Sequence, residues 1–284
     1  METRMRKGFF SPRRFGQQLL RDFAGGYRGM LIAMAAVAGT VIVLSALTTL
    51  GISQGDGMTV GGAGTFHLGF FVQLLFFGGF IVTSLAFREA RQNGAGIFYM
   101  TLPASPFEKL ASKLVVTSVG FALGSLVFYT ATAAVSEGIN RLIFGAGHPM
   151  FNPFDSTVLR AVGLYLITQS VYLLGSLWFR KLAFVKTVLW ITIFAVGFAL
   201  VAGIAARILL AAHFAPSAVQ LPGVKIFGDS LTLSNEFLQG AFGPGTRGYE
   251  GLLRFTLAAK ILFYGALAPV CWLASYYKLR EIEV

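Results

Sequence analysis

Six apolar runs, each long enough to cross about 30 Å of hydrocarbon as a helix, constrain the fold of this chain more than any other feature. They lie near residues 30–50, 66–87, 110–135, 158–178, 185–212 and 255–276. Apolar residues are continuous in these runs instead of alternating, and only a helix satisfies its own backbone polar groups in lipid. The sequence therefore predicts an all-α integral membrane protein with six transmembrane helices, in which residues 1–29 precede a membrane domain over 30–278 and residues 279–284 form a tail.

The charge content agrees with a membrane protein. Only 12% of the residues are charged, whereas a soluble domain has roughly 25%. A net charge of +11 is typical of a nucleic-acid-binding protein only where the cations form a solvated patch, and here they mostly flank the apolar runs. We expect membrane lipids, and no nucleic acid, among the partners.

The distribution of Lys and Arg predicts the orientation. If the N-terminus is cytoplasmic, 16 of the 23 basic residues fall on the inner side and 7 on the outer side. Acidic residues divide equally, so the bias belongs to the cations, as the positive-inside rule requires. This predicts a multi-pass protein of the cytoplasmic (inner) membrane with both termini in the cytoplasm.

The segment before the first run has an amphipathic pattern. Ser11-Pro12 is a helix-start signal, and Phe15, Leu19 and Phe23 then recur at helical spacing. The other faces carry Arg13, Arg14, Gln17, Gln18 and Arg21. We predict an interfacial helix with its apolar stripe in the acyl boundary and its cations among lipid phosphates. The alternative is a basic tail that only enforces topology.

A polar connector, residues 88–113, joins the second and third runs on the predicted cytoplasmic side. Near its end Ser105 can cap a helix, Pro106 suits the first helical position, and Glu108 stands where a capping box requires a carboxylate. The pattern predicts that a new helix begins at Pro106.

The sequence lacks the usual signals of an enzyme. It has no Gly-Lys dipeptide, and therefore no phosphate-binding loop of the Walker type. Residues 243–248 match the glycine spacing of a dinucleotide site, but a proline within them and their place in an outer loop indicate a turn. Cys271 is the single cysteine and lies in an apolar run, so a disulfide or thiolate metal site within the chain is excluded. We expect no catalytic residue and no cofactor on this chain.

The three histidines do not form a local ligand motif. His67, His148 and His213 fall at outer span ends or in outer loops, without an acidic residue or second histidine at ligand spacing. Two of them could meet in space, but the favoured interpretation places each as a polar residue at the lipid headgroup level, and no metal site is expected.

Three polar residues within the apolar runs are possible members of a translocation path. Lys260 lies about one and a half turns into the last run, and ionisable groups at that depth usually face protein or a water-filled path. Gln73 and Gln169 could line the same path, but hydrogen bonding between packed helices is the alternative for both.

The connector reads YMTLPASPFEKLASK over residues 99–113, and this stretch together with the six-run topology resembles permease subunits of ABC-2 type ABC transporters. In many of those permeases a similar Leu-Pro-x-Ser stretch, a Glu-Lys pair and another lysine precede the third span. The resemblance implies the membrane half of an exporter, in which two permease chains, identical or different, bind two cytoplasmic ABC ATPase subunits that carry ATP and Mg.

In that family the connector forms a coupling helix that fits a cleft of the ATPase. Carried onto this chain, the resemblance assigns the contact to Glu89, Arg91, Gln92, Ile97, Phe98, Tyr99 and Met100, with Pro103, Ser105 and Glu108 setting how the third span departs. An apolar centre with a charged rim suits docking. The alternative is a loop whose aromatic residues lie in the membrane interface.

The function expected from the resemblance is outward transport of a substrate, driven by a partner's ATP hydrolysis. Few ionisable groups in the runs favour a lipidic, amphipathic or hydrophobic peptide cargo over a sugar chain. An ATP-independent transporter or channel, and a membrane scaffold or assembly factor, are the alternatives. A secondary transporter usually shows span repeats or broken helices, and the sequence has neither.

Overall fold

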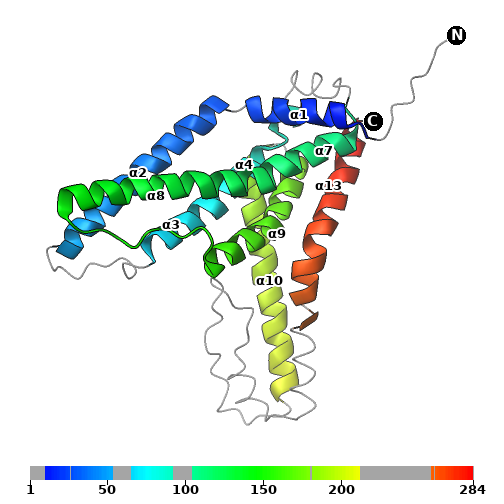
Figure 1. The fold of residues 1–284 in the computed structure, drawn as a ribbon. Helices are drawn as coiled ribbons and strands as arrows, with labels where there is room; N and C mark the ends of the chain where they lie inside the picture. Colours follow the sequence, from blue (N-terminus) through cyan, green and yellow to red (C-terminus); the bar gives the residue numbers. More distant parts are fainter. Residues whose placement is uncertain are drawn as a thin grey trace. The chain divides into compact units, whose positions relative to one another are not determined.

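A computed structural model describes residues 10–25, 27–53, 65–91, 104–179, 181–211, 257–258 and 260–283, and every regular element within these ranges is a helix. The helices are α1 Pro12–Ala24, α2 Tyr27–Ser53, α3 Phe66–Gln73, α4 Gly79–Leu85, α5 Arg88–Arg91, α7 Pro106–Val115, α8 Phe121–Phe144, α9 Ser156–Trp178, α10 Ala183–Ala211 and α13 Leu267–Glu283 (Figure 1). Three π-helical segments continue α-helices without a break: η1 Leu74–Gly78, η2 Val116–Gly120 and η3 Leu262–Ala266. The predicted all-α class is confirmed.

Among the described residues, five helices are long and apolar enough to cross a membrane, which indicates a multi-pass membrane protein. They are Arg28–Gly51, Phe66–Ala90, Pro106–Phe144, Ser156–Trp178 and Ala183–Val201, and each overlaps one of the first five predicted runs. The sixth predicted run, 255–276, falls partly outside the described residues. A sixth span, the inner membrane and the cytoplasmic termini therefore stay predictions.

The third helix is longer than the apolar run that predicted it. It continues for 39 residues, from Pro106 to Phe144, through α7, η2 and α8, instead of ending near residue 135. The apolar pattern stops there because Ser136, Glu137 and Asn140 follow, but these three side chains are buried in the protein. At 1.5 Å per residue the helix is about 58 Å long, well beyond the thickness of a hydrocarbon core. It ends at Gly145, whose left-handed conformation (φ 66°) favours glycine.

The chain divides into two compact units: residues 1–184 with 271–284, and residues 185–270. Residues of the membrane domain predicted over 30–278 thus belong to both units. The larger unit holds α1 to α9 and most of α13, and the smaller holds most of α10 and η3.

Helices of the larger unit meet closely around Tyr165 of α9. A Cβ added to Gly79 would lie 2.3 Å from its ring, so α4 approaches α9 only because residue 79 lacks a side chain. The Tyr165 hydroxyl donates to the Thr117 carbonyl at 2.5 Å, inside η2. Because a π-helical turn changes which carbonyls the helix itself satisfies, this hydroxyl supports the third helix at its irregular segment. Phe71, Leu75 and Tyr129 complete the buried core nearby.

Local signals account for the start of α9. Asp155 is its N-cap, and one carboxylate oxygen accepts a hydrogen bond from the Thr157 backbone N–H at 2.7 Å. That bond holds the pKa of Asp155 below its ordinary value.

Candidate functional site

The two ends of the connector belong to the described part of the chain. α5 contains Glu89 and ends at Arg91, and description resumes at Ala104. The predicted contact residues between these points, Gln92, Ile97, Phe98, Tyr99, Met100 and Pro103, lie outside the described residues. The described part of this site consists of the two ends of the connector and the residues that contact them.

The helix start predicted at Pro106 is confirmed. The Ser105 hydroxyl accepts a hydrogen bond from the Glu108 N–H at 3.2 Å, and a Glu108 carboxylate oxygen accepts one from the Ser105 N–H at 2.8 Å. This is a complete capping box with proline in the first turn. It satisfies backbone donors that would otherwise have no partner at the start of a 39-residue helix.

Glu108 also binds the N-terminal helix. Its Oε1 accepts from the Ser11 N–H at 2.6 Å and pairs with the Arg14 guanidinium at 3.1 Å, and its side chain is fully buried. One carboxylate therefore caps α7 and fastens the beginning of α1 to it. The resemblance lets Glu108 set how the third span departs, and in this structure its carboxylate positions α7, since its oxygens bind the Ser105 N–H and α1.

A polar stripe on α1 faces α7. Arg14, Gln18 and Asp22 are spaced by four residues and so lie on one side of the helix. Asp22 pairs with Lys113 at 2.9 Å and accepts from the Ser112 hydroxyl at 2.6 Å. We call these contacts, with those of Glu108, the α1 clamp.

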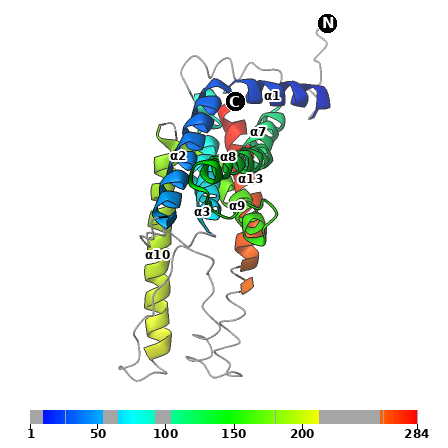
Figure 2. The same ribbon diagram turned by 60° about the vertical axis from the view of Figure 1, so that its left-hand side comes forward.

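The α1 clamp shows what the polar face of α1 contacts. A helix is present at Pro12–Ala24, and its interfacial placement among lipid phosphates stays a prediction, but Arg14 and Gln18 contact protein. They face protein, because α7 supplies Glu108 and α1 supplies Asp22 opposite Lys113, so each charge finds a partner. α1 and α7 lie side by side in Figure 1 and again in the turned view of Figure 2.

Apolar packing joins the two ends of the connector. Phe87 and Ala90 precede residues 92–103, Leu110 follows them, and all three pack in one buried cluster. The rest of that cluster comes from α9 and α13 and comprises Leu173, Leu177 and Leu279. An ion pair of 3.8 Å between Arg21 and Glu89, both about half exposed, links α1 to α5 at the surface. The residues on both sides of 92–103 are thus held by this one buried cluster, which we call the base of the connector.

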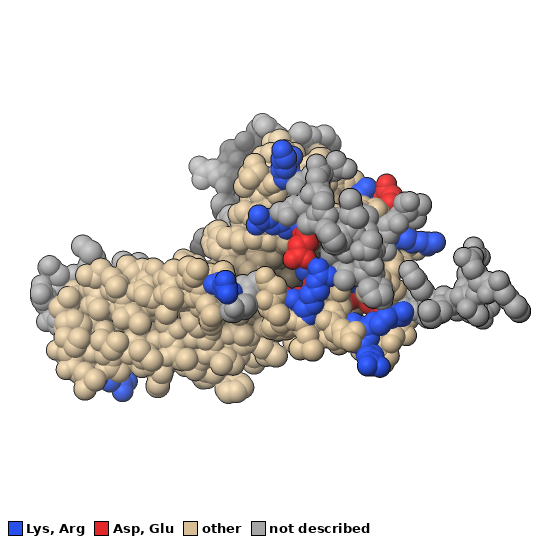
Figure 3. Space-filling model, turned by 90° about the horizontal axis from the view of Figure 1, so that it is seen from above, with Lys and Arg blue, Asp and Glu red and all other residues tan. Residues whose placement is uncertain are grey.

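Charged side chains gather over this base. Seen from above in Figure 3, Lys, Arg, Asp and Glu crowd the end of the molecule where α1 and α7 lie, whereas the length of α2 and α8 is almost entirely uncharged. A polar, charged rim at one end of apolar helices is what a membrane domain presents to a water-soluble partner.

The three possible path residues lie in different environments. Gln169 is fully buried, and its amide oxygen accepts from the Thr83 and Thr117 hydroxyls at 3.4 and 3.5 Å, so it lies among packed helices. Gln73 is exposed on α3, and Lys260 is exposed in the smaller unit. The geometry of Gln169 matches the packing alternative, and a path role for all three stays a prediction.

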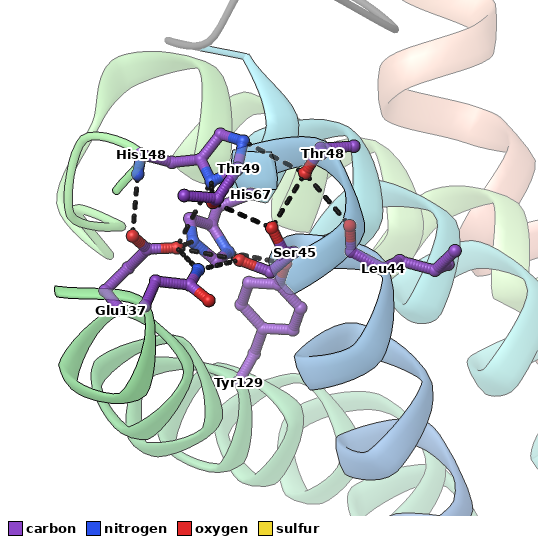
Figure 4. A network of polar contacts seen from close by, with 9 residues as sticks. Leu44, Ser45, Thr48, Thr49, His67, Tyr129, Glu137 and His148 are labelled. Carbon is purple, nitrogen blue, oxygen red and sulfur yellow. Dashed lines mark hydrogen bonds and ion pairs between the residues drawn. The ribbon is translucent and has the colours of Figure 1, made fainter. Parts of the chain in front are cut away.

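A second polar cluster lies at the other end of the third helix (Figure 4). We call it the histidine cluster: Ser45, Thr48 and Thr49 of α2, His67 of α3, Tyr129, Glu137 and Asn140 of α8, and His148 beyond α8. His67 and His148 are only 3% and 2% exposed, so their side chains face protein, and their predicted depth at headgroup level stays a prediction. His213 lies outside the described residues.

Glu137 is the centre of the histidine cluster. Its Oε1 lies 2.8 Å from His67 Nε2 and 3.4 Å from His148 Nδ1, and it also accepts from the Ser45 hydroxyl at 2.9 Å. Its Oε2 accepts from the His148 backbone N–H at 2.6 Å. The imidazole of His148 stacks on the Phe66 ring at 4.5 Å between centroids.

Sequence reasoning missed both clusters for different reasons. The spacing of Arg14, Gln18 and Asp22 was visible as a polar stripe and could have been read as a docking face. His67 and Glu137 are 70 positions apart, and only tertiary folding unites them. A carboxylate at residue 137, directly after an apolar run, was the one available hint.

No protein-family model, curated protein or solved structure matches this chain, so its function must be argued from the sequence and from the geometry above.

Proposed function

We propose that this chain is a membrane-spanning permease subunit of an ATP-driven exporter of ABC-2 type. It works as a pair with a second permease chain, and two cytoplasmic ABC ATPase subunits bind ATP and Mg. The observation that carries the proposal is the mounting of the connector: both its ends rest on one base, and one of them starts a 39-residue helix.

This arrangement is suited to transmit a movement of residues 92–103 to the third helix. A partner that moves residues 92–103 acts on two fixed ends instead of on a loose loop. At the second end, the capping box and Leu110 join the connector to α7. Because α7, η2 and α8 are continuous, a tilt of α7 reaches the far end of the helix at Glu137.

Through the α1 clamp, α1 would move together with α7. α1 is tied to α7 through Glu108 with Arg14 and through Lys113 with Asp22, so the two helices move together. An amphipathic helix that follows a span in this way displaces lipid at the inner surface when the span tilts. This favours a cargo that leaves through or along lipid, and we infer a lipidic, amphipathic or peptide substrate moved outward.

The test uses the chain co-expressed with an ABC ATPase encoded beside it and reconstituted in liposomes. The disruptive variant carries Ile97→Gln, Phe98→Gln and Met100→Gln. The matched control carries Met150→Gln and Phe154→Gln, two exposed apolar side chains in the segment between α8 and α9.

We expect the ATPase to co-purify with the wild type and the control. With the disruptive variant, we expect ATP hydrolysis to fall to the level of the isolated ATPase. Unchanged hydrolysis in the disruptive variant contradicts the coupling assignment. Transport that proceeds without any ATPase points to a transporter or channel of another class, and absence of both transport and ATPase binding points to a scaffold.

A further inference from the structure

In the histidine cluster, the hydrogen bonds around His148 indicate which of its ring nitrogens carries a lone pair. Thr48 Oγ1 is 2.9 Å from the Leu44 carbonyl and 3.0 Å from the Ser45 carbonyl, and its single proton is directed to this backbone pair. The same oxygen is 3.2 Å from His148 Nε2, and the tautomer that fits this geometry has Nε2 as the donor. In a neutral imidazole the other nitrogen, Nδ1, then carries a lone pair.

That lone pair faces a carboxylate. His148 Nδ1 is 3.4 Å from Glu137 Oε1 and 3.5 Å from the Thr49 hydroxyl, which donates to the Ser45 carbonyl at 2.8 Å. Two buried acceptors that face each other repel unless a cation lies between them. Either a proton or a metal ion can take that place.

The expected distance between the two acceptor atoms differs for a shared proton and for a bound metal ion. A proton shared between a charged nitrogen and a carboxylate draws the two atoms to about 2.7–2.9 Å. Two ligands of a tetrahedral zinc ion, each bonded at about 2.1 Å, stand about 3.4 Å apart. The separation of His148 Nδ1 from Glu137 Oε1 is 3.4 Å, as between two zinc ligands, whereas His67 Nε2 lies 2.8 Å from the same oxygen, at hydrogen-bond distance.

His67 supplies the third ligand atom. One ligand atom each from His67, Glu137 and His148 lies within 4.8 Å of the other two, and all three residues are buried. The His67 Nε2 to Glu137 Oε1 separation of 2.8 Å would open by about 0.6 Å to reach ligand spacing.

Each histidine also has a partner on its other nitrogen. His67 Nδ1 is 3.2 Å from the Tyr129 hydroxyl, and His148 Nε2 is 3.2 Å from the Thr48 hydroxyl. Metal-bound histidines usually donate this second N–H to such a group, which fixes the ring and the nitrogen that binds.

We propose that His67, Glu137 and His148 bind one divalent transition-metal ion, with Zn²⁺ as the best match to two imidazoles and a carboxylate. Water takes the fourth position. The ion fastens the start of α3 and the segment after α8 to the end of the third helix. This site does not depend on the proposed transport function, because it rests on the described contacts alone.

The test uses the full chain in detergent, stripped with a chelator and dialysed first against Zn²⁺ and then against Co²⁺. We expect about one ion per chain by mass spectrometry, the visible absorption of a four-coordinate Co²⁺ site, and a higher temperature of unfolding with metal. A folded wild-type chain that binds no Zn²⁺ and shows no Co²⁺ absorption overturns the proposal without any variant.

Variants assign the ligands. His148→Gln and Glu137→Gln should each abolish the stoichiometric ion. Thr48→Ala should weaken binding by about 10–100-fold through loss of the second N–H partner. His213→Gln is the control and should bind as the wild type does. Loss of the ion in His213→Gln together with its retention in His148→Gln contradicts the assignment.

Discussion

The two ends of the third helix use buried charge in opposite ways. Near Pro106, Glu108 and Lys113 each meet an opposite charge on α1, so the α1 clamp balances two cations with two carboxylates. Near Phe144, Glu137 meets two imidazoles, and no Lys or Arg is paired with it among the described residues. The Pro106 end is electrically balanced and holds a helix. The Phe144 end sets one carboxylate against two imidazoles, which suits the proposed metal ion.

The largest expected loss of stability comes from removing an ion pair of the α1 clamp. Asp22→Ala leaves Lys113 buried without its partner, and removing one member of a buried pair costs about 3–5 kcal/mol. The loss should be local, so hydrogen exchange should show residues 12–24 released from α7 while α9 stays protected.

A double variant checks the cause. Asp22→Leu with Lys113→Met removes both charges and should restore most of the protection, since an apolar pair of similar volume replaces a buried ion pair at little cost. A double variant no better than Asp22→Ala contradicts the role of the pair. Lys278→Ala is the surface comparison, because its pair with Glu281 is exposed and is worth about 0–1 kcal/mol.

A glycine substitution can disrupt the Phe144 end of the third helix. A Cβ on Gly147 would lie 2.4 Å from Glu137 Oε2, an oxygen already held by the His148 N–H. Gly147→Ala should therefore displace the carboxylate and lower the free energy of unfolding by about 1–3 kcal/mol. Thermal unfolding in detergent measures it.

Gly138→Ala is the matched control, because nothing lies within 4 Å of the added Cβ and the residue neighbours Glu137 in the sequence. It should be neutral or slightly stabilising, as alanine favours a helix interior. Equal destabilisation by the two variants would show that Glu137 is not held as described.

The capping box at the Pro106 end was predictable from sequence, whereas the α1 clamp at that end and the histidine cluster at the Phe144 end were not. Ser105, Pro106 and Glu108 act through contacts three residues apart, which a single sequence displays. Glu137 ended the predicted span because a carboxylate is costly in lipid. It is tolerated because His67 and Ser45, far away in the sequence, enclose it.

A smaller loss of stability is expected when the contact to η2, between the two ends of the third helix, is removed. Tyr165→Phe removes the hydrogen bond to the Thr117 carbonyl in η2 and should cost about 1 kcal/mol. Tyr172→Phe is the control, since the Tyr172 ring stacks on Phe80 at 4.1 Å and keeps that contact. An effect of Tyr172→Phe as large as that of Tyr165→Phe would argue against a special role for η2.

The smallest effect is expected at the surface of the connector's base. Arg21→Ala breaks an exposed pair of 3.8 Å with Glu89 and should change the free energy of unfolding by about 0–1 kcal/mol. Coupling to an ATPase should survive, because Phe87, Ala90 and Leu110 still hold both ends. Loss of coupling with unchanged stability would assign Arg21 or Glu89 to the partner contact itself.

The most direct test of the central claim is a photo-cross-link from the connector. A benzoyl-phenylalanine placed at Phe98 should cross-link to the nucleotide-binding subunit in native membranes, and one placed at Phe154, exposed in the segment after α8, should not. A cross-link to that subunit from position 154, or none from position 98 while the subunit is co-expressed, would contradict the proposal that this chain is a permease driven through its connector.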